Sequence, residues 1–316
     1  MDSQTPLKVF TGSAHPALAR AICAHLSVPL GRARSVRFKN ENMKVKIEEN
    51  VRGADVFVVQ PSCPPVSDGI VELLIMLDAL RFASAARITA VTPYFPYVRS
   101  DKKDEPRISI TARLCADLLQ TAGADRVIAI DLHSPQVQGF LRVPSDQLTA
   151  REILADHFRK RPDLAEHVVV APDAGEVKDA AGFAKRLGVS LAIVDKRRFA
   201  DDEKARAVHL VGEVRGRRCL IVDDEIATGG TVLESADFVL REGARDVSVA
   251  ATHAVFSGDA VQLLERSPIR EVVVTDSIPL RVENPGDKFT VLSVAGLLAE
   301  AIARVHDGRS VSQLFV

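Results

Sequence analysis

Short apolar runs alternate with longer amphipathic stretches along most of the chain. The apolar runs are nearly continuous and rich in β-branched residues, which is typical of parallel strands that are covered on both faces. We predict strands at residues 7–10, 55–60, 87–92, 126–131, 167–171, 191–194, 219–222, 247–252 and 271–275.

The stretches between these runs show the 3.6-residue period of amphipathic helices. We predict helices at residues 16–26, 68–82, 110–121, 149–160, 176–187, 232–242 and 295–305. Gly123, Gly188 and Gly243 each follow such a stretch and precede the next strand, as helix-terminating glycines do. The repeated order of strand, helix and strand predicts an α/β fold with mostly parallel sheets.

The chain of 316 residues is long enough for two domains. The alternation is interrupted at residues 134–148, and we place the domain boundary there. Residues 122–131 (AGADRVIAID) also resemble residues 242–251 (EGARDVSVAA). We therefore predict two similar domains, residues 1–148 and 149–316, each a mostly parallel sheet flanked by helices.

Composition narrows the class of protein. A hydrophobic fraction of 47% supports buried cores, and a net charge of −1 argues against a nucleic-acid or membrane partner. Four widely spaced cysteines show neither disulfide nor zinc spacing, which favours a reducing, cytoplasmic compartment. No signal peptide is recognised, and the most apolar stretch, 70–80, contains two acids and is too short to span a bilayer.

The most informative stretch follows the predicted strand 219–222. Asp223 and Asp224 come first, then a turn of small and hydroxyl residues, then a helical pattern. Glycines allow the backbone to approach a ligand, and a helix N-terminus favours negative charge, so this turn is typical of a phosphate site. The two carboxylates suit sugar hydroxyls or a metal. We predict a phosphorylated sugar bound at Asp223, Asp224, Ala227, Thr228, Gly229, Gly230 and Thr231.

Ligands of parallel α/β sheets lie beyond the carboxyl ends of the strands. His133 and Asp173 follow two such strands and could hold Mg²⁺ near a phosphate, although a histidine there can equally be held by backbone groups. Lys196 and Arg198 precede a polar stretch that reads as a mobile loop. They could stabilise charge on a transferring phosphoryl group, or simply form a solvated basic turn.

A nucleotide could be recognised by a second group of loops. Arg99 lies in a segment rich in proline and tyrosine, and an arginine beside aromatic rings can hold a base or its phosphates. An exposed charged loop is the alternative. Residues 38–42 form a similar polar turn, which could also be a plain hairpin. The chain lacks the glycine-rich motifs of P-loop and dinucleotide-binding proteins and the Gly-x-Ser-x-Gly turn of hydrolases.

Residues 222–231 (VDDEIATGGT) resemble the phosphoribosyl diphosphate motif that phosphoribosyltransferases share with ribose-phosphate diphosphokinases. Further segments resemble the diphosphokinases alone, and the similarity runs nearly from end to end. These segments are residues 72–80, 93–99, 131–140, 172–173 and 194–198. The resemblance implies a type I phosphoribosyltransferase-like fold in both domains. It also implies transfer of the β,γ-diphosphoryl group of ATP to the C1 hydroxyl of ribose 5-phosphate, yielding phosphoribosyl diphosphate and AMP for nucleotide biosynthesis.

The same resemblance implies roles for individual residues. Lys196 and Arg198 would be catalytic, and Arg198 would also contact ribose 5-phosphate beside the 223–231 segment. ATP would be bound in the first domain by Phe38, Asn40, Glu41, Asn42, Arg99, Ser100, Asp101 and His133. Mg²⁺ would be bound by His133, Asp173 and Asp131. The family forms dimers that assemble further, often to hexamers, with residues 38–42 reaching into the active site of a partner subunit.

The chain departs from the usual family pattern at several of these positions. Residues 40–42 read Asn-Glu-Asn where the family usually has Asp-Gly-Glu, and Ser100 replaces a glutamine. Ala227 stands where an aspartate is usual, whereas Glu176 stands where a glycine is usual. Phe82 replaces a frequent basic residue of a segment linked to regulation by phosphate and ADP.

Two alternatives to an active diphosphokinase follow from the sequence. The substitutions at residues 40–42 would fit a non-catalytic homologue that binds nucleotide and regulates an active partner. A phosphoribosyltransferase would share the 222–231 motif, but it would leave the first domain and the basic residues 196–198 without a function.

Overall fold

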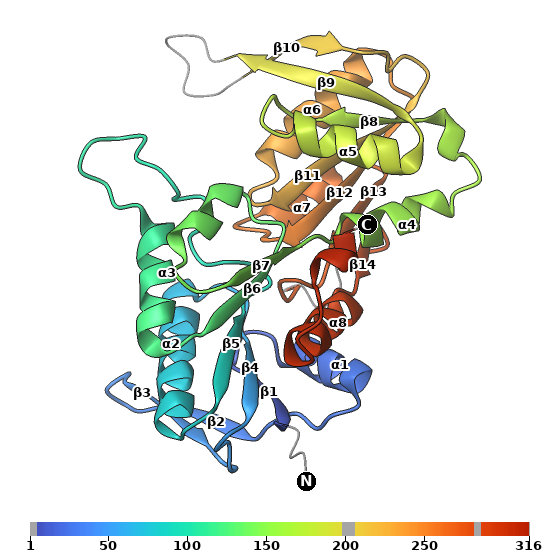
Figure 1. Ribbon diagram of the computed structural model, residues 1–316. Coiled ribbons are helices and arrows are strands. Elements are labelled where there is room, and N and C mark those ends of the chain that lie inside the picture. The colour runs from blue at the N-terminus through green and yellow to red at the C-terminus, as the bar shows by residue number, and fades with distance from the viewer. Residues whose placement is uncertain (1–4, 198–205, 281–285, 316) are drawn as a thin grey trace. The chain divides into compact units, whose positions relative to one another are not determined.

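The structure is a computed structural model that describes residues 5–197, 206–280 and 286–315 (Figure 1). Its contacts divide the chain into two compact units. The first unit contains the described residues of 1–149, 277–279 and 293–316, and the second contains those of 150–276 and 280–292.

The first unit is built on a five-stranded sheet in which every strand pair is parallel. Its strands, in spatial order, are β1 (Leu7–Thr11), β4 (Asp55–Val59), β5 (Arg87–Val91), β6 (Arg126–Ile130) and β7 (Ser145–Leu148). Helices α2 (Val66–Phe82) and α3 (Thr111–Ala122) pack together on one face, and α1 (Pro16–Leu26) packs with α8 (Ala295–His306) on the other (Figure 1). An antiparallel hairpin, β2 (Ala33–Arg37) and β3 (Met43–Ile47), packs against α2.

The second unit is built on a seven-stranded sheet that is parallel except for one edge strand, β10. In spatial order its strands are β10 (Arg206–Val211), β9 (Ser190–Arg197), β8 (His167–Ala171), β11 (Arg218–Ile226), β12 (Asp246–Ala254), β13 (Glu271–Thr275) and β14 (Phe289–Leu292). Its helices are α4 (Arg151–Arg159), α5 (Val177–Leu187), α6 (Gly230–Arg241) and α7 (Ala260–Arg266). The predicted α/β class with mostly parallel sheets is confirmed.

Both faces of the second sheet are buried because its central strand is apolar on both sides. Cys219 and Ile221 of β11 pack in the core that contains α6 and α7 residues. Leu220 and Val222 pack in the core that contains α4 and α5 residues. This two-sided burial explains why the strand reads as a continuous apolar run, and it places the polar residues that follow at the strand's carboxyl end.

The C-terminal helix belongs to the first unit, although the sequence-based division placed all of 149–316 in the second domain. Its end is held by the buried carboxylate of Asp55. The His306 Nδ1 atom lies 2.8 Å from Asp55 Oδ2, and Arg87 donates to Asp55 Oδ1 at 2.8 Å and to the Val305 carbonyl at 2.9 Å. Helical periodicity identified this helix, but it carries no information about which of two sheets the helix covers.

The observed elements correct the sequence reading in other places. Residues 134–148 are not a linker, because they form the 3₁₀ segment η1 (Pro135–Phe140) and strand β7 of the first sheet. Strands β2, β3, β7, β10 and β14 and helix α7 were not predicted as elements. All four cysteines are free and buried. Among the described residues, none of the helices combines the length and apolar character needed to cross a membrane.

Candidate active site

Strand β11 is longer than its apolar run. It continues to Ile226, so Asp223 and Asp224 lie within the strand rather than after it. Its pairing with β8 ends at Ile221, whereas its pairing with β12 continues to Ile226. Beyond Ile221, the edge of β11 that faced β8 is therefore open to the loop between β8 and α5, which is where the acidic residues lie.

A three-residue turn then leads directly into helix α6, which begins at Gly230, two residues earlier than predicted. Gly229 caps the helix at φ +81°, a left-handed conformation that favours glycine. Thr228, Gly230 and Thr231 are exposed to solvent at this helix N-terminus. The partial positive charge there favours an anion such as a phosphate group. The structure thus has the strand, turn and helix order expected of a phosphate site.

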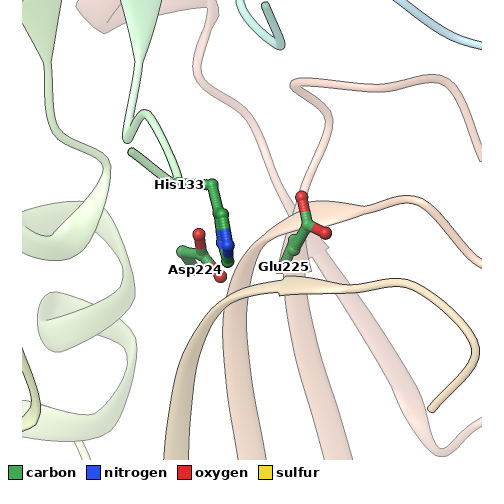
Figure 2. Close-up of side chains that lie close together, drawn as sticks. All are labelled: His133, Asp224 and Glu225. Atoms are coloured by element: carbon green, nitrogen blue, oxygen red, sulfur yellow. The ribbon is translucent and has the colours of Figure 1, made fainter. Parts of the chain in front are cut away.

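Three carboxylates gather beside this turn. Oxygen atoms of Glu176, Asp223 and Asp224 all lie within 4.8 Å of one another. Glu225 adds a further buried carboxylate, and Figure 2 shows the side chains of Asp224 and Glu225 pointing in different directions at the end of β11. The regular alternation of the strand is interrupted here, because Ile226 packs in the same core as Ile221. This interruption allows the neighbouring Asp223 and Asp224 side chains to approach one another.

The electrostatics of the cluster favour a bound cation. Burial raises the pKa of Asp223 well above its ordinary value, and the nearby charges of Asp224 and Glu176 raise it further. Carboxylates crowded in this way resist ionising together unless a positive charge or hydrogen-bond donors compensate them. Carboxylate oxygens are also the ligands that Mg²⁺ and similar hard cations prefer, so this donor set fits a divalent metal.

Asp173, a predicted metal ligand, has a structural role at the start of the β8–α5 loop. Its Oδ1 atom accepts hydrogen bonds from the backbone N–H groups of Gly175, at 2.8 Å, and Glu176, at 3.3 Å. These bonds shape the turn that presents Glu176. In the cluster described above, the third acid is Glu176 and not Asp173. A metal role for Asp173 stays a prediction.

Glu176 was recognised in the sequence only as a departure from a family pattern, and it was not among the predicted site residues. The signal that could have identified it is its place after β8, the neighbour of β11 in the sheet. The order of strands in the sheet, which the sequence did not supply, was needed to see that β8 and β11 are adjacent.

The predicted site residues of the first unit follow β6 or lie in the loop before α3. Asp131 is buried with φ +34°, whereas His133 is exposed. The hydroxyl of Ser134 donates to the carboxylate of Asp101, which ties these two segments together. Arg99 is exposed. The structure therefore places Asp101 beside the turn that follows β6, as a shared nucleotide site within this unit would require.

Ser100 stabilises the beginning of α3. Its hydroxyl accepts a hydrogen bond from the Thr111 N–H at 3.3 Å, and its carbonyl accepts one from the Ala112 N–H at 3.1 Å. These bonds close the loop of residues 101–110 at its base. A contact between Ser100 and ATP stays a prediction.

Residues 38–42 form the tip of the β2–β3 hairpin. The Phe38 N–H donates to the Asn42 carbonyl and the Glu41 N–H to the Phe38 carbonyl, each at 2.9 Å. Asn40 accepts from the Asn42 N–H at 3.3 Å, and Glu41 adopts φ +65°. The Phe38 ring is half-exposed. The tip is thus a tight turn that presents an aromatic side chain and polar groups to solvent.

The basic residues predicted to be catalytic lie at the end of β9. The backbone of Lys196 pairs with that of Ala207 in the antiparallel strand β10. Arg198 and the rest of the predicted loop up to residue 205 lie outside the described residues. Their roles therefore stay predictions.

Two mostly parallel sheets flanked by helices, one ending in an acidic strand and a glycine-rich helix start, define an α/β protein with a phosphoribosyltransferase-like fold. A solved phosphoribosylpyrophosphate synthetase from Mycobacterium smegmatis matches with a TM-score of 0.91 and 41% identity, covering 96% of this chain and 100% of that one. The family model for the N-terminal domain of ribose phosphate pyrophosphokinase matches residues 7–123, and that for the phosphoribosyl synthetase-associated domain matches 198–316.

Curated relatives agree along the whole chain. The ribose-phosphate pyrophosphokinase of Deinococcus radiodurans is 49% identical over 99% of this chain and 98% of its own length. That of Caldanaerobacter subterraneus is 47% identical over 98% of both chains. The chain belongs to the ribose-phosphate pyrophosphokinase family.

Proposed function

We propose that this protein is an active ribose-phosphate diphosphokinase. It transfers the β,γ-diphosphoryl group of ATP to the C1 hydroxyl of ribose 5-phosphate and yields phosphoribosyl diphosphate and AMP. The observation that carries the proposal is the similarity to ribose-phosphate pyrophosphokinases over the full length of the chain. This similarity includes the first unit, which a simple phosphoribosyltransferase would not require.

We assign ribose 5-phosphate to the β11–α6 segment. The 5-phosphate would lie at the N-terminus of α6 against Thr228–Thr231, where exposed polar groups and the helix dipole favour an anion. Asp223 and Asp224 would accept hydrogen bonds from the ribose hydroxyls. Lys196 and Arg198 would stabilise the charge that develops on the transferring phosphoryl groups. No covalent intermediate with the protein is needed, because positioning and charge stabilisation suffice for phosphoryl transfer.

We assign ATP to the first unit, with Arg99, Ser100, Asp101 and His133 as its contacts. A divalent cation, Mg²⁺ in our proposal, neutralises phosphate charge in this chemistry. The acidic residues at the end of β11 fit such an ion, and we keep Asp131, His133 and Asp173 as further candidate ligands.

We propose that the protein works as a dimer-based homo-oligomer, such as a hexamer, in the cytoplasm. The tip of the β2–β3 hairpin, at Phe38 and residues 40–42, would complete the ATP site of a partner subunit. The exposed rings of Phe38 and Phe82 fit burial in such an assembly. Sedimentation that detects only monomer at assay concentrations would contradict the partner role of the hairpin.

The activity is tested by measuring AMP and phosphoribosyl diphosphate formed by the purified protein from ATP, ribose 5-phosphate and Mg²⁺. We expect both products in equal amounts and a loss of at least about a hundredfold in Lys196→Ala, the scale seen when one transition-state contact is removed. Nucleotide binding without turnover would instead indicate the non-catalytic regulatory homologue.

The division of labour between the two units is tested with Asp224→Ala. We expect this change to weaken binding of ribose 5-phosphate more than binding of ATP, because Asp224 lies in the proposed sugar site. Calorimetric titration of each substrate separates the two affinities. Equal losses of both would contradict our assignment of the sugar to the β11–α6 segment.

A further inference from the structure

Two departures from the usual family pattern lie close to the same pair of aspartates. Ala227 follows the Asp223–Asp224 pair and lacks the carboxylate that the family usually has there. Glu176 adds a carboxylate where the family usually has a glycine. In the sequence these positions are about fifty residues apart and show no relation.

The structure brings the added carboxylate to the pair that has lost its neighbour. Glu176 oxygen lies within 4.8 Å of carboxylate oxygens of both Asp223 and Asp224. It approaches from the β8 side of β11, where the pairing of the two strands has ended. Ala227 lies on the other side, where its carbonyl accepts a 2.9 Å hydrogen bond from the N–H of Ser257, which follows β12. The number of acidic groups is thus retained, while one of them changes sides.

The position of Glu176 is fixed by its backbone. Its N–H donates to Asp173 Oδ1, and its carbonyl accepts the first hydrogen bond of helix α5, from the Ala180 N–H at 2.9 Å. A turn held at both ends presents the side chain in one direction at little entropic cost. A glycine at this position would leave the turn without a side chain to offer.

We propose that Glu176 supplies the third carboxylate of the divalent-cation site beside Asp223 and Asp224, in place of the side chain that Ala227 lacks. The proposal rests on the diphosphokinase function, because the cation is the one that the family requires. Two aspartates alone would provide fewer oxygens than a hard cation needs from the protein, and a third carboxylate increases both the ligand number and the negative charge.

The inference is tested by cation binding in the absence of nucleotide. Free Mn²⁺, measured by electron paramagnetic resonance, reports the dissociation constant of the full-length wild type, Glu176→Gln and Glu176→Gly. We expect roughly tenfold weaker binding in both variants, the scale on which residues of a metal site change affinity. Glu213→Gln is the matched control. It removes one charge from an exposed residue before the opposite end of β11, and its affinity should equal that of the wild type.

A reversal experiment separates replacement from simple charge. Ala227→Asp restores the usual family residue, and in the Glu176→Gly background it should recover most of the lost Mn²⁺ affinity. The same Ala227→Asp change made in Glu213→Gln should not be needed to maintain binding, since that background still contains Glu176.

Two results would overturn the proposal. One is unchanged Mn²⁺ binding in folded Glu176→Gly, with folding verified by thermal melting. The other is weakened binding that Ala227→Asp fails to improve, which would mean that Glu176 does not stand in for that side chain. Product formation by the wild type is measured separately, so a failure of the enzymatic assignment is distinguishable from a failure of this inference.

Discussion

At the scale of single residues, environment decides what a side chain contributes. Asp173 and Glu176 lie three positions apart in one loop, yet Asp173 binds backbone N–H groups and Glu176 faces other acids. Glu49 has the opposite surroundings to those of the acidic cluster. Burial raises its pKa, but hydrogen bonds from Lys8 and from the Arg32 N–H, with the charges of both residues, outweigh burial and lower the pKa below 4.5.

This lowered pKa makes the contribution of Glu49 to stability depend on pH. A carboxylate whose pKa is lower in the folded state stabilises the fold above its unfolded pKa of 4.5, and the effect is lost as the pH falls through the folded value. We expect Glu49→Gln to cost roughly 1 kcal/mol at pH 7 and almost nothing well below the folded pKa.

Urea unfolding at a series of pH values measures this difference. Glu48→Gln is the control, because Glu48 makes only a 4.0 Å contact with Arg34 at the surface. A cost for Glu49→Gln that is independent of pH would show that Lys8 and Arg32 do not act through the carboxylate charge.

Glu41 provides a second test at this scale. Its φ of +65° is a conformation in which a side chain costs about 1–2 kcal/mol and glycine costs nothing. The larger backbone entropy of unfolded glycine offsets part of this gain. We expect Glu41→Gly to raise the unfolding free energy by up to about 1 kcal/mol, and Lys39→Gly, at a neighbouring position of the same turn, to lower it. Destabilisation by both changes in thermal melts would contradict a strained Glu41.

At the scale of elements, apolar pattern and helix ends determined most of what forms. The predicted bounds of β8, β13 and α1 agree with the structure because their apolar runs are bounded by clear polar or proline signals. Helix α7 was not predicted, since it spans only Ala260–Arg266 and shows too few turns for a period to be recognised. Its stability depends on a residue distant in sequence, Lys288.

Lys288 caps the C-terminal end of α7. Its ammonium group donates to the carbonyls of Leu264, Glu265 and Ser267 at 2.9, 2.7 and 2.9 Å. A cation at this end of a helix also interacts favourably with the helix dipole. We expect Lys288→Met to destabilise the protein by about 2 kcal/mol, because it removes three charge-assisted hydrogen bonds.

Chemical denaturation measures the effect of Lys288→Met. The control is Lys185→Met, which changes an exposed lysine in the last turn of α5 and should alter stability by less than about 0.5 kcal/mol. Equal costs for the two variants would contradict the capping role of Lys288.

At the scale of the whole molecule, the path of the chain links distant segments. The C-terminal helix α8 returns to the first unit and packs on α1. The buried Asp55 carboxylate is paired with Arg87 and His306, so removing the helix would leave that charge less well compensated. The stability of the first unit therefore depends on residues from both ends of the chain.

We expect a chain truncated after residue 292 to lose structure in the first unit. Hydrogen exchange should show reduced protection in β1 and β4, while β11 and β12 keep theirs. Arg309→Ala, which changes an exposed residue beyond α8, is the control and should leave both patterns unchanged. Loss of protection confined to the second unit would instead support the division at residue 148.

The sequence by itself determined the α/β class, most strands and helices, and the family, because these depend on local period and on motifs that are contiguous in the chain. It also determined the strand, acidic pair and glycine-rich turn at residues 219–231. Tertiary structure alone decided that α8 covers the first sheet and that Glu176 joins Asp223 and Asp224. Both depend on which strands and helices become neighbours in space, and that order is set by packing between segments far apart in the sequence.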